Sequence, residues 1–595
     1  MSDSFTASTT IDEVLHVNAA LSRILNARGI DTCCGGSATL AEATEIRGLG
    51  LAELLAELNA AAPAAAVAEQ PPGEAPAAVR SCTPPVPEEA ALAATPSGVT
   101  QPVPTPKPAQ FVPFFIASLL IALTFGATLG MLTLATMTLP WSFIGAVPVG
   151  MAKIAHGYSQ VFGFATLFIM GVAYHIMPRF TGNPVATVGL AKASFWLQTG
   201  GVVLIAAGML IGAPVAAPAR VLGSLLLLAA ATAFGSTVHR TLAGGTPTPE
   251  HLERYLRAGC VWLLLASALA CITAAGVEVL QPAVWETALW GFAASWIFGM
   301  SLRVLPVFLG LPPAPGRYSA WLFAGYQAAA ALWITVSVAE AWYLIPLARA
   351  LAGSVLGVAA ATFVALIGIF GPRLERRGRS EQGYEKFMVS AYAWLLVALF
   401  FAPGWSAAAA LRGGAAPSLL LDFGRHAFTL GFLTQIIFGV STRIIPVFTG
   451  APLWNPAWHT TTYFLLNAAV LARGLEVAVE LAGWSEAWPY ISISGPLAVG
   501  AFAAFSANVM LTVRSRPPVA AVSGGDPVAD ALVVDLLQVP GALDLLVSRG
   551  FRPLQNPAMR AAMGRTLTLR QACRIHGIDV TPLAAELRRL AAQRS

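Results

Sequence analysis

HAFTLGFLTQIIFGVSTRIIPVFTG, residues 426–450, is an apolar stretch with a histidine at its start and Arg443 near its end. Two further stretches, at 163–182 and 291–310, share its pattern. The three align without a gap as G-F-x6-G-x3-[HR]-[IV]-x-P-x-F-x-G, with Gly171, Gly299 and Gly439 as their anchor glycines. The interval between successive anchor glycines has room for about four membrane helices, because one such helix needs roughly 20 apolar residues.

The composition is that of a membrane protein. Of the 595 residues, 56% are hydrophobic and 11% charged, and the mean hydropathy is +0.68. A soluble chain would carry about 25% charged residues. We therefore predict an all-α, polytopic membrane protein of about twelve transmembrane helices in three four-helix repeats, with the lipid bilayer as a partner. No basic tract or nucleic-acid motif is found, so no nucleic-acid partner is expected.

Twelve apolar segments can be counted, and the charges between them predict their orientation. They begin near residues 111, 152, 190, 217, 259, 285, 319, 342, 388, 426, 460 and 489. Cations gather after the even-numbered segments, most densely between residues 373 and 386, whereas the other connections hold acids such as Glu340 and Glu486. Because cationic loops stay on the cytoplasmic side, both termini are expected in the cytoplasm. The chain before the first apolar segment is soluble in character, so no cleavable signal peptide is expected.

Small helical domains are predicted before and after the membrane region. Residues 39–58 align with 568–587 without a gap, so the second domain is a copy of the first, without its thiols. Segments rich in Pro, Ala or Gly predict the linkers. The predicted order is 1–62, a small helical CCGG domain; 63–110, a Pro/Ala-rich linker; 111–514, the membrane domain; 515–527, a linker; and 528–595, the degenerate second small domain.

Two histidines lie in the signature stretches. The predicted topology places His156 and His426 near the outer ends of the second and tenth helices, at nearly the same place in the repeat frame. Two imidazoles at one depth are what axial ligation of a haem iron requires, and ionisable residues inside a membrane are usually functional. The alternative is that each is a hydrogen-bonded polar residue near the membrane surface.

Three more ionisable residues occupy one position of the repeat, namely His175, Arg303 and Arg443. As a set they read as cations at the inner interface that extend toward the polar surface or cap a helix end. The alternative is a role in binding a haem propionate or another anion.

Cys33 and Cys34 are adjacent in a glycine-rich turn on the predicted cytoplasmic side. A disulfide is not expected there, because the compartment is reducing and neighbouring cysteines bridge only with strain. Exposed thiols near a helix N-terminus suit a soft metal such as iron, or reaction with nitrosyl species. A purely structural turn is the alternative.

The segments HGYSQVFGF…IMGVAYHIMPRFTG and RHAFTLGFLTQIIFGVSTRIIPVFTG resemble the signature helices of the NnrS family. The resemblance extends over most of the membrane region. That family comprises bacterial inner-membrane proteins described as containing haem and copper and linked to the nitric oxide response. The resemblance implies a b-type haem at His156 and His426, with copper as an option whose ligands the sequence does not place. It also implies a multi-pass protein of the bacterial cytoplasmic membrane.

The helix grouping is also similar to subunit I of the haem–copper oxidases, whose second and tenth helices hold a low-spin haem. Here the sixth and seventh segments, WETALWGFAASWIFGM and YSAWLFAGYQAAAALWI, contain no histidine. The three-histidine copper site of those enzymes therefore has no ligands in this chain, and oxygen reduction by that mechanism is not expected.

GIDTCCGG followed by TLAEA is similar to the N-terminal domain of ScdA-type iron–sulfur repair proteins. This resemblance covers the first small domain and implies a role with iron centres under nitrosative or oxidative stress. The carboxylate- and histidine-rich di-iron bundle of those proteins is absent here, so a thiol-based sensor or docking module is the prediction. The C-terminal copy resembles related small domains found beside hybrid-cluster and redox proteins.

Together these features predict a haem protein that protects against nitric oxide or relieves nitrosylated iron centres. Its partners would be nitric oxide or nitrosyl iron species and an unidentified redox protein, and whether it is an enzyme stays open. One alternative is a twelve-helix solute transporter whose histidines belong to a proton relay, since transporters also contain internal repeats. Another is a quinol-linked electron-transfer subunit.

Overall fold

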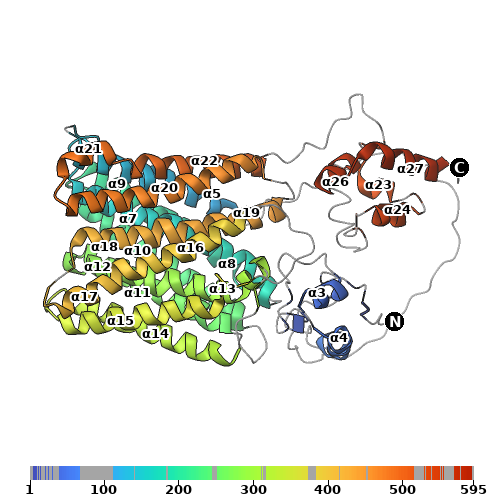
Figure 1. Ribbon diagram of the computed structural model, residues 1–595, viewed down its shortest axis with the longest axis horizontal. Coiled ribbons are helices and arrows are strands. Elements are labelled where there is room, and N and C mark those ends of the chain that lie inside the picture. Colours follow the sequence, from blue (N-terminus) through green and yellow to red (C-terminus); the bar gives the residue numbers. More distant parts are fainter. Residues whose placement is uncertain are drawn as a thin grey trace, which may run out of the picture.

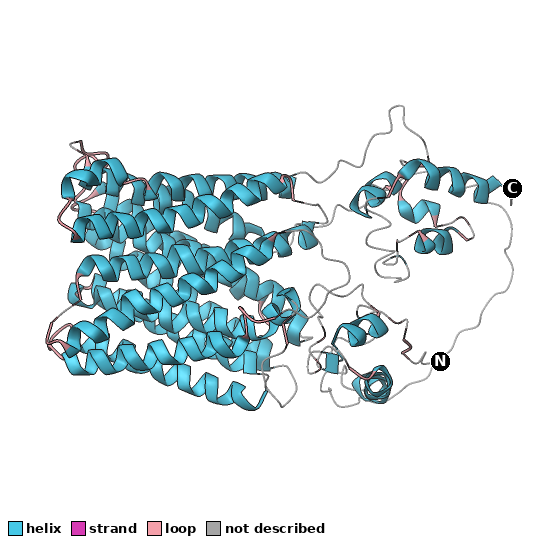
Figure 2. Ribbon diagram, viewed as in Figure 1, coloured by secondary structure: helices cyan, strands magenta, loops and turns pink. Residues whose placement is uncertain are grey.

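The computed structural model describes most of residues 5–66 outside a gap at 31–38, residues 112–514 apart from short gaps, and parts of 528–592. All regular elements in these ranges are helices (Figure 2), and an isolated antiparallel bridge joins Leu532 to Thr568. The predicted all-α class is confirmed for the described residues. The short gaps are at 140, 182–184, 244–250, 310, 313–315, 373–382, 415 and 450–452.

The membrane region is a bundle of long helices (Figure 1). Several of these helices contain a short π-helical segment between two α-helical parts. In chain order the elements are α5 Val112–Ile121, η2 Ala122–Thr128, α6 Leu129–Thr138, α7 Val149–Tyr158, η3 Ser159–Ala165, α8 Thr166–Thr181, α9 Val188–Ile211, α10 Ala216–Ala243, α11 His251–Ala274, η4 Glu278–Leu280, α12 Gln281–Glu286, η5 Thr287–Ala293, α13 Ala294–Leu309, α14 Gly316–Ala339, α15 Pro346–Ile367, α16 Tyr384–Leu399, η6 Phe400–Gly404, α17 Trp405–Leu411, α18 Ser418–His426, η7 Ala427–Leu433, α19 Thr434–Thr449, α20 Pro456–Leu481, η8 Ser485–Ala487, α21 Trp488–Ile491 and α22 Ser494–Arg514.

Within the described residues, 11 helices are long and apolar enough to cross a membrane, which confirms a multi-pass fold. The remaining predicted span, α20, is 26 residues long but carries Arg473, Glu476 and Glu480 and is not among them. The exact count of twelve and the four-helix repeat unit stay predictions.

The three signature stretches lie in the inner helices of the bundle. These are α7–η3–α8, α12–η5–α13 and α18–η7–α19, called here the first, middle and third signature helices. Their apolar windows are 78–89% buried, against 39–50% for the other candidate spans. All three run in the same direction, since α8, α13 and α19 end at one end of the bundle and α12 and α18 lie at the other (Figure 1).

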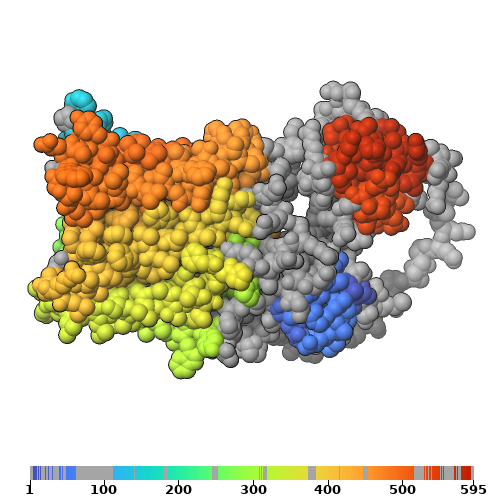
Figure 3. All heavy atoms as spheres, viewed as in Figure 1, coloured from blue at the N-terminus to red at the C-terminus, as the bar shows by residue number. Residues whose placement is uncertain are grey.

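The other helices form the lipid-facing exterior. Large apolar side chains are exposed along them, as expected where lipid rather than water is the solvent. On the face seen in Figure 3, the yellow and orange parts of the chain close into one continuous surface. Exposed side chains of this kind include Leu225, Leu264, Trp321, Val358 and Phe464.

Each signature helix contains a π-helical segment of the same length at the same repeat position. The segments η3, η5 and η7 each span 7 residues and end at equivalent positions before the anchor glycine of their copy. A π segment makes i→i+5 hydrogen bonds and is frequent at functional sites. The relation among the three stretches therefore extends from their sequence to their local helical geometry.

Each signature helix also packs on the helix before it through glycines. A Cβ added at Gly171, Gly299 or Gly439 would lie 2.6–3.0 Å from the Cβ of an aromatic residue on that neighbour. A side chain at Gly171 or Gly299 would overlap its neighbour, and one at Gly439 would be tightly packed, so these glycines permit the close approach of the helices. The three aromatic residues are Phe114, Tyr255 and Phe387.

The described parts of the small domains have apolar cores of their own, built mainly from leucine, valine and alanine. Ion pairs join helices on the surface of each, Arg28 with Glu53 and Glu57 in the first and Arg549 with Glu586 in the second. Their helices are α3 Leu40–Arg47, α4 Leu51–Ala66, α23 Val533–Leu536, α24 Ala542–Ser548, α26 Leu569–His576 and α27 Val580–Ala592.

Replacing Gly299 by Ala should destabilise the bundle by about 1–3 kcal/mol, because the new methyl group overlaps Tyr255 at a packed interface. The measurement is the thermal unfolding midpoint in detergent. Gly325→Ala in α14 is the control, since nothing lies within 4 Å of its Cβ position and alanine favours helix. Equal midpoints for the two variants would contradict the packing role of Gly299.

Candidate functional site

The structure brings His156 and His426 together. His156 lies near the end of α7 and His426 is the last residue of α18, each just before a π segment. Their ring centroids are 6.5 Å apart and the ring planes differ by 15°. The two positions differ slightly in the repeat frame, because the residue of the first copy that aligns with His426 is Tyr158. The rings nevertheless lie close together with nearly parallel planes, one on the first and one on the third signature helix.

The hydrogen bonds of the two rings define their tautomers. Nδ1 of His156 lies 2.9 Å from the carbonyl oxygen of Gly126, and Nδ1 of His426 lies 2.9 Å from the carbonyl oxygen of Asp422. A carbonyl oxygen only accepts, so each Nδ1 carries the proton and donates. Each Nε2 then has a lone pair directed away from that bond, which is the arrangement of a metal-binding histidine.

The spacing of the rings suits a metal ion between them. With a metal–nitrogen bond of about 2.0–2.1 Å on each side and about 1.1 Å from nitrogen to ring centre, the centroids would lie roughly 6.3 Å apart. The observed 6.5 Å matches this value and exceeds a stacking contact. Both rings are half-buried rather than sealed in the core. The pair therefore fits the two axial ligands of a haem iron.

Helix α6 makes room for the ring of His156. A Cβ at Gly130 would lie 2.7 Å from both Cε1 and Nδ1 of that ring. The carbonyl that accepts from His156 belongs to Gly126 in the π segment η2, one turn earlier on the same helix. The first span thus both holds His156 and leaves space for it.

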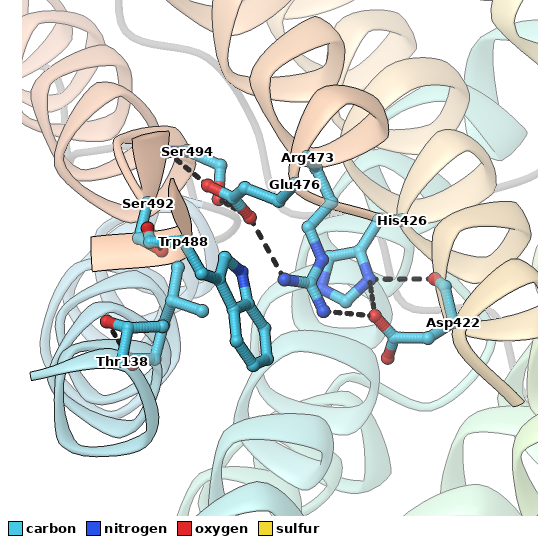
Figure 4. A network of polar contacts seen from close by, with 9 residues as sticks. Thr138, Asp422, His426, Arg473, Glu476, Trp488, Ser492 and Ser494 are labelled. Atoms are coloured by element: carbon cyan, nitrogen blue, oxygen red, sulfur yellow. Dashed lines mark hydrogen bonds and ion pairs between the residues drawn. The ribbon is translucent and has the colours of Figure 1, made fainter. Parts of the chain in front are cut away.

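A chain of charged side chains holds His426 from behind (Figure 4). The carboxylate Oδ2 of Asp422 lies 3.4 Å from Nδ1 of His426 and pairs with Nη2 of Arg473. Nη1 of Arg473 donates to Oε2 of Glu476 at 3.0 Å. Glu476 is fully buried and accepts from the backbone N–H and the hydroxyl of Ser494 at 3.0 and 2.8 Å.

This chain puts the carboxylate of Asp422 in direct contact with His426, whereas the same group acts on His156 only from farther away. Asp422 and Glu476 carry two negative charges and Arg473 one positive charge, so the group is net −1 beside His426. A carboxylate behind a ligating imidazole orients the ring and raises its basicity. The sequence analysis did not assign these residues, although three charged residues in otherwise apolar helices are a functional signal.

A second polar group lies between the middle and third signature helices. Glu286 occupies the repeat position equivalent to His426 and is 5% exposed. Nε1 of Trp333 donates to it at 2.8 Å, and Arg425 pairs with it at 3.5 Å. It lines a pocket with space for about one water molecule (≈10 Å³). Other lining residues include Arg349, Gly424 and Phe428.

The remaining predicted cations are not brought to the histidine pair. His175, Arg303 and Arg443 lie toward the opposite ends of the signature helices. His426 and Arg443 share the third copy, and His156 and His175 share the first. In each case several helical turns, or roughly 25 Å of helix, separate the two residues. The guanidinium of Arg443 lies 5.4–5.5 Å from the ring centres of Tyr384 and Phe308. This placement favours the interpretation as cations near a helix end.

The predicted thiol site has no structural description, and copper was an option to which the sequence assigned no ligands. Cys33 and Cys34 lie outside the described residues. Among the residues that are described, no group of three or more His, Cys, Asp or Glu side chains could hold a metal ion. In the second small domain Cys573 is 1% exposed. Burial raises the pKa of its thiol to about 11, as expected of a packing residue.

Comparisons with known proteins agree with this architecture. A family described as "NnrS protein" matches residues 109–516. Residues 7–62 match a domain of unknown function named ScdA_N (DUF542), and residues 530–583 match another, DUF1858. No match is found among curated proteins.

One similar solved structure is titled as a cryo-EM structure of a heme-copper terminal oxidase dimer. The match has a TM-score of 0.55 at 13% identity and covers 81% of this chain and 97% of that chain. At this identity the similarity shows a common fold.

Replacing Arg473 by Met should destabilise the protein by about 3–5 kcal/mol, because Asp422 and Glu476 would be left without their buried partner. The thermal midpoint in detergent measures this loss. Arg412→Met, at an exposed turn after α17, is the matched control and should change little. A midpoint for the Arg473 variant equal to that of the control would contradict the network.

Proposed function

Because the chain belongs to the NnrS family over residues 109–516, we propose that it is a haem protein of the bacterial cytoplasmic membrane that acts in the response to nitric oxide or nitrosative stress. The family and the fold support a membrane metalloprotein. The observation that carries the haem assignment is the pair of facing imidazoles, each with Nδ1 on a carbonyl and Nε2 directed away from it.

In this proposal His156 and His426 would hold one b-type haem through their Nε2 atoms. The haem would supply an iron that accepts one electron or binds a small gas. The carbonyl of Gly126 and the carbonyl and carboxylate of Asp422 keep both Nε2 atoms in the ligating tautomer. Arg473 holds Asp422 in place. Copper is assigned to no residue, since the described side chains offer no group of three ligands.

The small N-terminal domain would contribute the thiols of Cys33 and Cys34 to the same response. Its match to the ScdA_N domain supports a role near iron centres. We propose that these thiols react with nitrosyl iron species or bind iron, and that a separate redox protein exchanges electrons with the haem. The distribution of cationic loops supports a cytoplasmic position for both termini.

An absorption spectrum of the purified protein tests the haem assignment. The wild-type chain should show a Soret band, and His156→Ala combined with His426→Ala should lose it because both axial ligands are gone. The control is that the double variant still inserts into the membrane, as measured by cell fractionation and by a reporter fused to one terminus. A wild-type protein without the band, from cells supplied with haem, would favour the transporter alternative.

The thiol role is tested separately from the haem. Replacing Cys33 and Cys34 together by Ser should leave haem content unchanged and lower the survival of cells exposed to a nitric oxide donor. Cys573→Ser is the matched control, because that thiol is buried in the second small domain. Unchanged survival of the double variant would remove the thiols from the proposal.

A further inference from the structure

We infer that the two histidines are unequal ligands: His426 is the fixed ligand of the iron, and His156 is the one that gives way to a neutral diatomic molecule such as nitric oxide. This inference rests on the proposed haem site and adds to it the way in which a gas reaches the iron. An iron with two histidine ligands has no free position, so a gas binds only where one histidine leaves.

His426 is held by charge and by its own helix. Its Nδ1 donates to the carbonyl oxygen of Asp422, one turn earlier in α18, and the carboxylate of the same residue lies 3.4 Å away. Behind it stand Arg473 and Glu476, which bring the group to a net charge of −1. Negative charge behind an imidazole makes Nε2 a stronger donor to a cationic iron, which strengthens the bond of His426.

His156 has a weaker hold. Among the described residues, its hydrogen-bond partner is the neutral carbonyl of Gly126, which belongs to a different helix. That helix, α5–η2–α6, is an outer helix with only 50% of its apolar window buried. The ring also packs against Gly130 of that helix, where a Cβ would lie 2.7 Å from two of the ring atoms. The contacts that hold His156 therefore involve a second, outer helix, whereas the hydrogen bond of His426 lies within its own helix.

The exchange needs no further reactant. Nε2 of His156 would release the iron and keep its lone pair, so the imidazole would stay neutral with its proton on Nδ1. A neutral diatomic molecule would bind in its place through a lone pair of its own. No proton moves and no redox partner is consumed in this step. Whether His156 keeps or loses its hydrogen bond to Gly126 does not change the number of protons or electrons in this step.

Single variants of the full-length protein in detergent provide the test, with carbon monoxide as the probe on the dithionite-reduced protein. His156→Ala should keep at least half of the haem, show a five-coordinate spectrum and bind carbon monoxide at least about tenfold faster than wild type. His426→Ala should lose most of its haem. Equal loss of haem in both variants, or retention of haem only in His426→Ala, overturns the inference.

A second pair of variants keeps both histidines, in case a ligand deletion fails to fold. Gly130→Ala places a methyl group 2.7 Å from the ring of His156 and should speed carbon monoxide binding. Asp422→Asn removes the negative charge behind His426. It should raise the reduction potential of the haem without a comparable gain in the rate of carbon monoxide binding. An unchanged rate in Gly130→Ala, or a larger gain in Asp422→Asn, overturns the inference. Wild-type protein without haem would instead refute the proposed function.

Discussion

An imidazole within a membrane bundle requires partners for its nitrogens, because lipid provides no hydrogen bonds. In this chain Nδ1 of His156 and Nδ1 of His426 each donate to a backbone carbonyl, which leaves Nε2 of each ring as the atom that can bind a metal ion. A metal ion between the rings satisfies both at once. The site, the charges behind His426 and the space beside His156 all depend on this requirement.

The same scaffold is used three times with different chemistry. One equivalent position of the repeat holds Tyr158 in the first copy, Glu286 in the middle copy and His426 in the third, each next to a π segment of equal length. In the third copy the position carries a metal-ligand type of side chain, and in the middle copy a buried carboxylate paired with Arg425. The repeated packing of glycine on aromatic residues holds the inner helices at equal depth, so a substitution at this one position changes the chemistry without changing the fold.

Much of this could be predicted from the sequence, and the limits have physical causes. Apolar length predicted a multi-pass helical bundle, and the repeated glycine skeleton placed His156 and His426 at matching positions of two repeats. That the three repeated stretches form the inner helices is seen only in the structure. The π segments could not be predicted, because no residue pattern distinguishes an i→i+5 turn from its α-helical neighbours. The pairing of Asp422 with Arg473 was also missed, since it joins two helices far apart in the sequence whose relative rotation is set by packing. The cations at the far helix ends, Arg303 and Arg443, share the repeat with the histidines but lie beyond their reach.

The electron paramagnetic resonance spectrum of the oxidised, purified protein tests most directly whether both imidazoles bind one iron. We expect one low-spin ferric haem per chain with two nitrogen ligands, and conversion of that signal to high-spin when His156 is removed. A high-spin signal in the wild-type protein, or low-spin haem that persists after removal of both histidines, would contradict it.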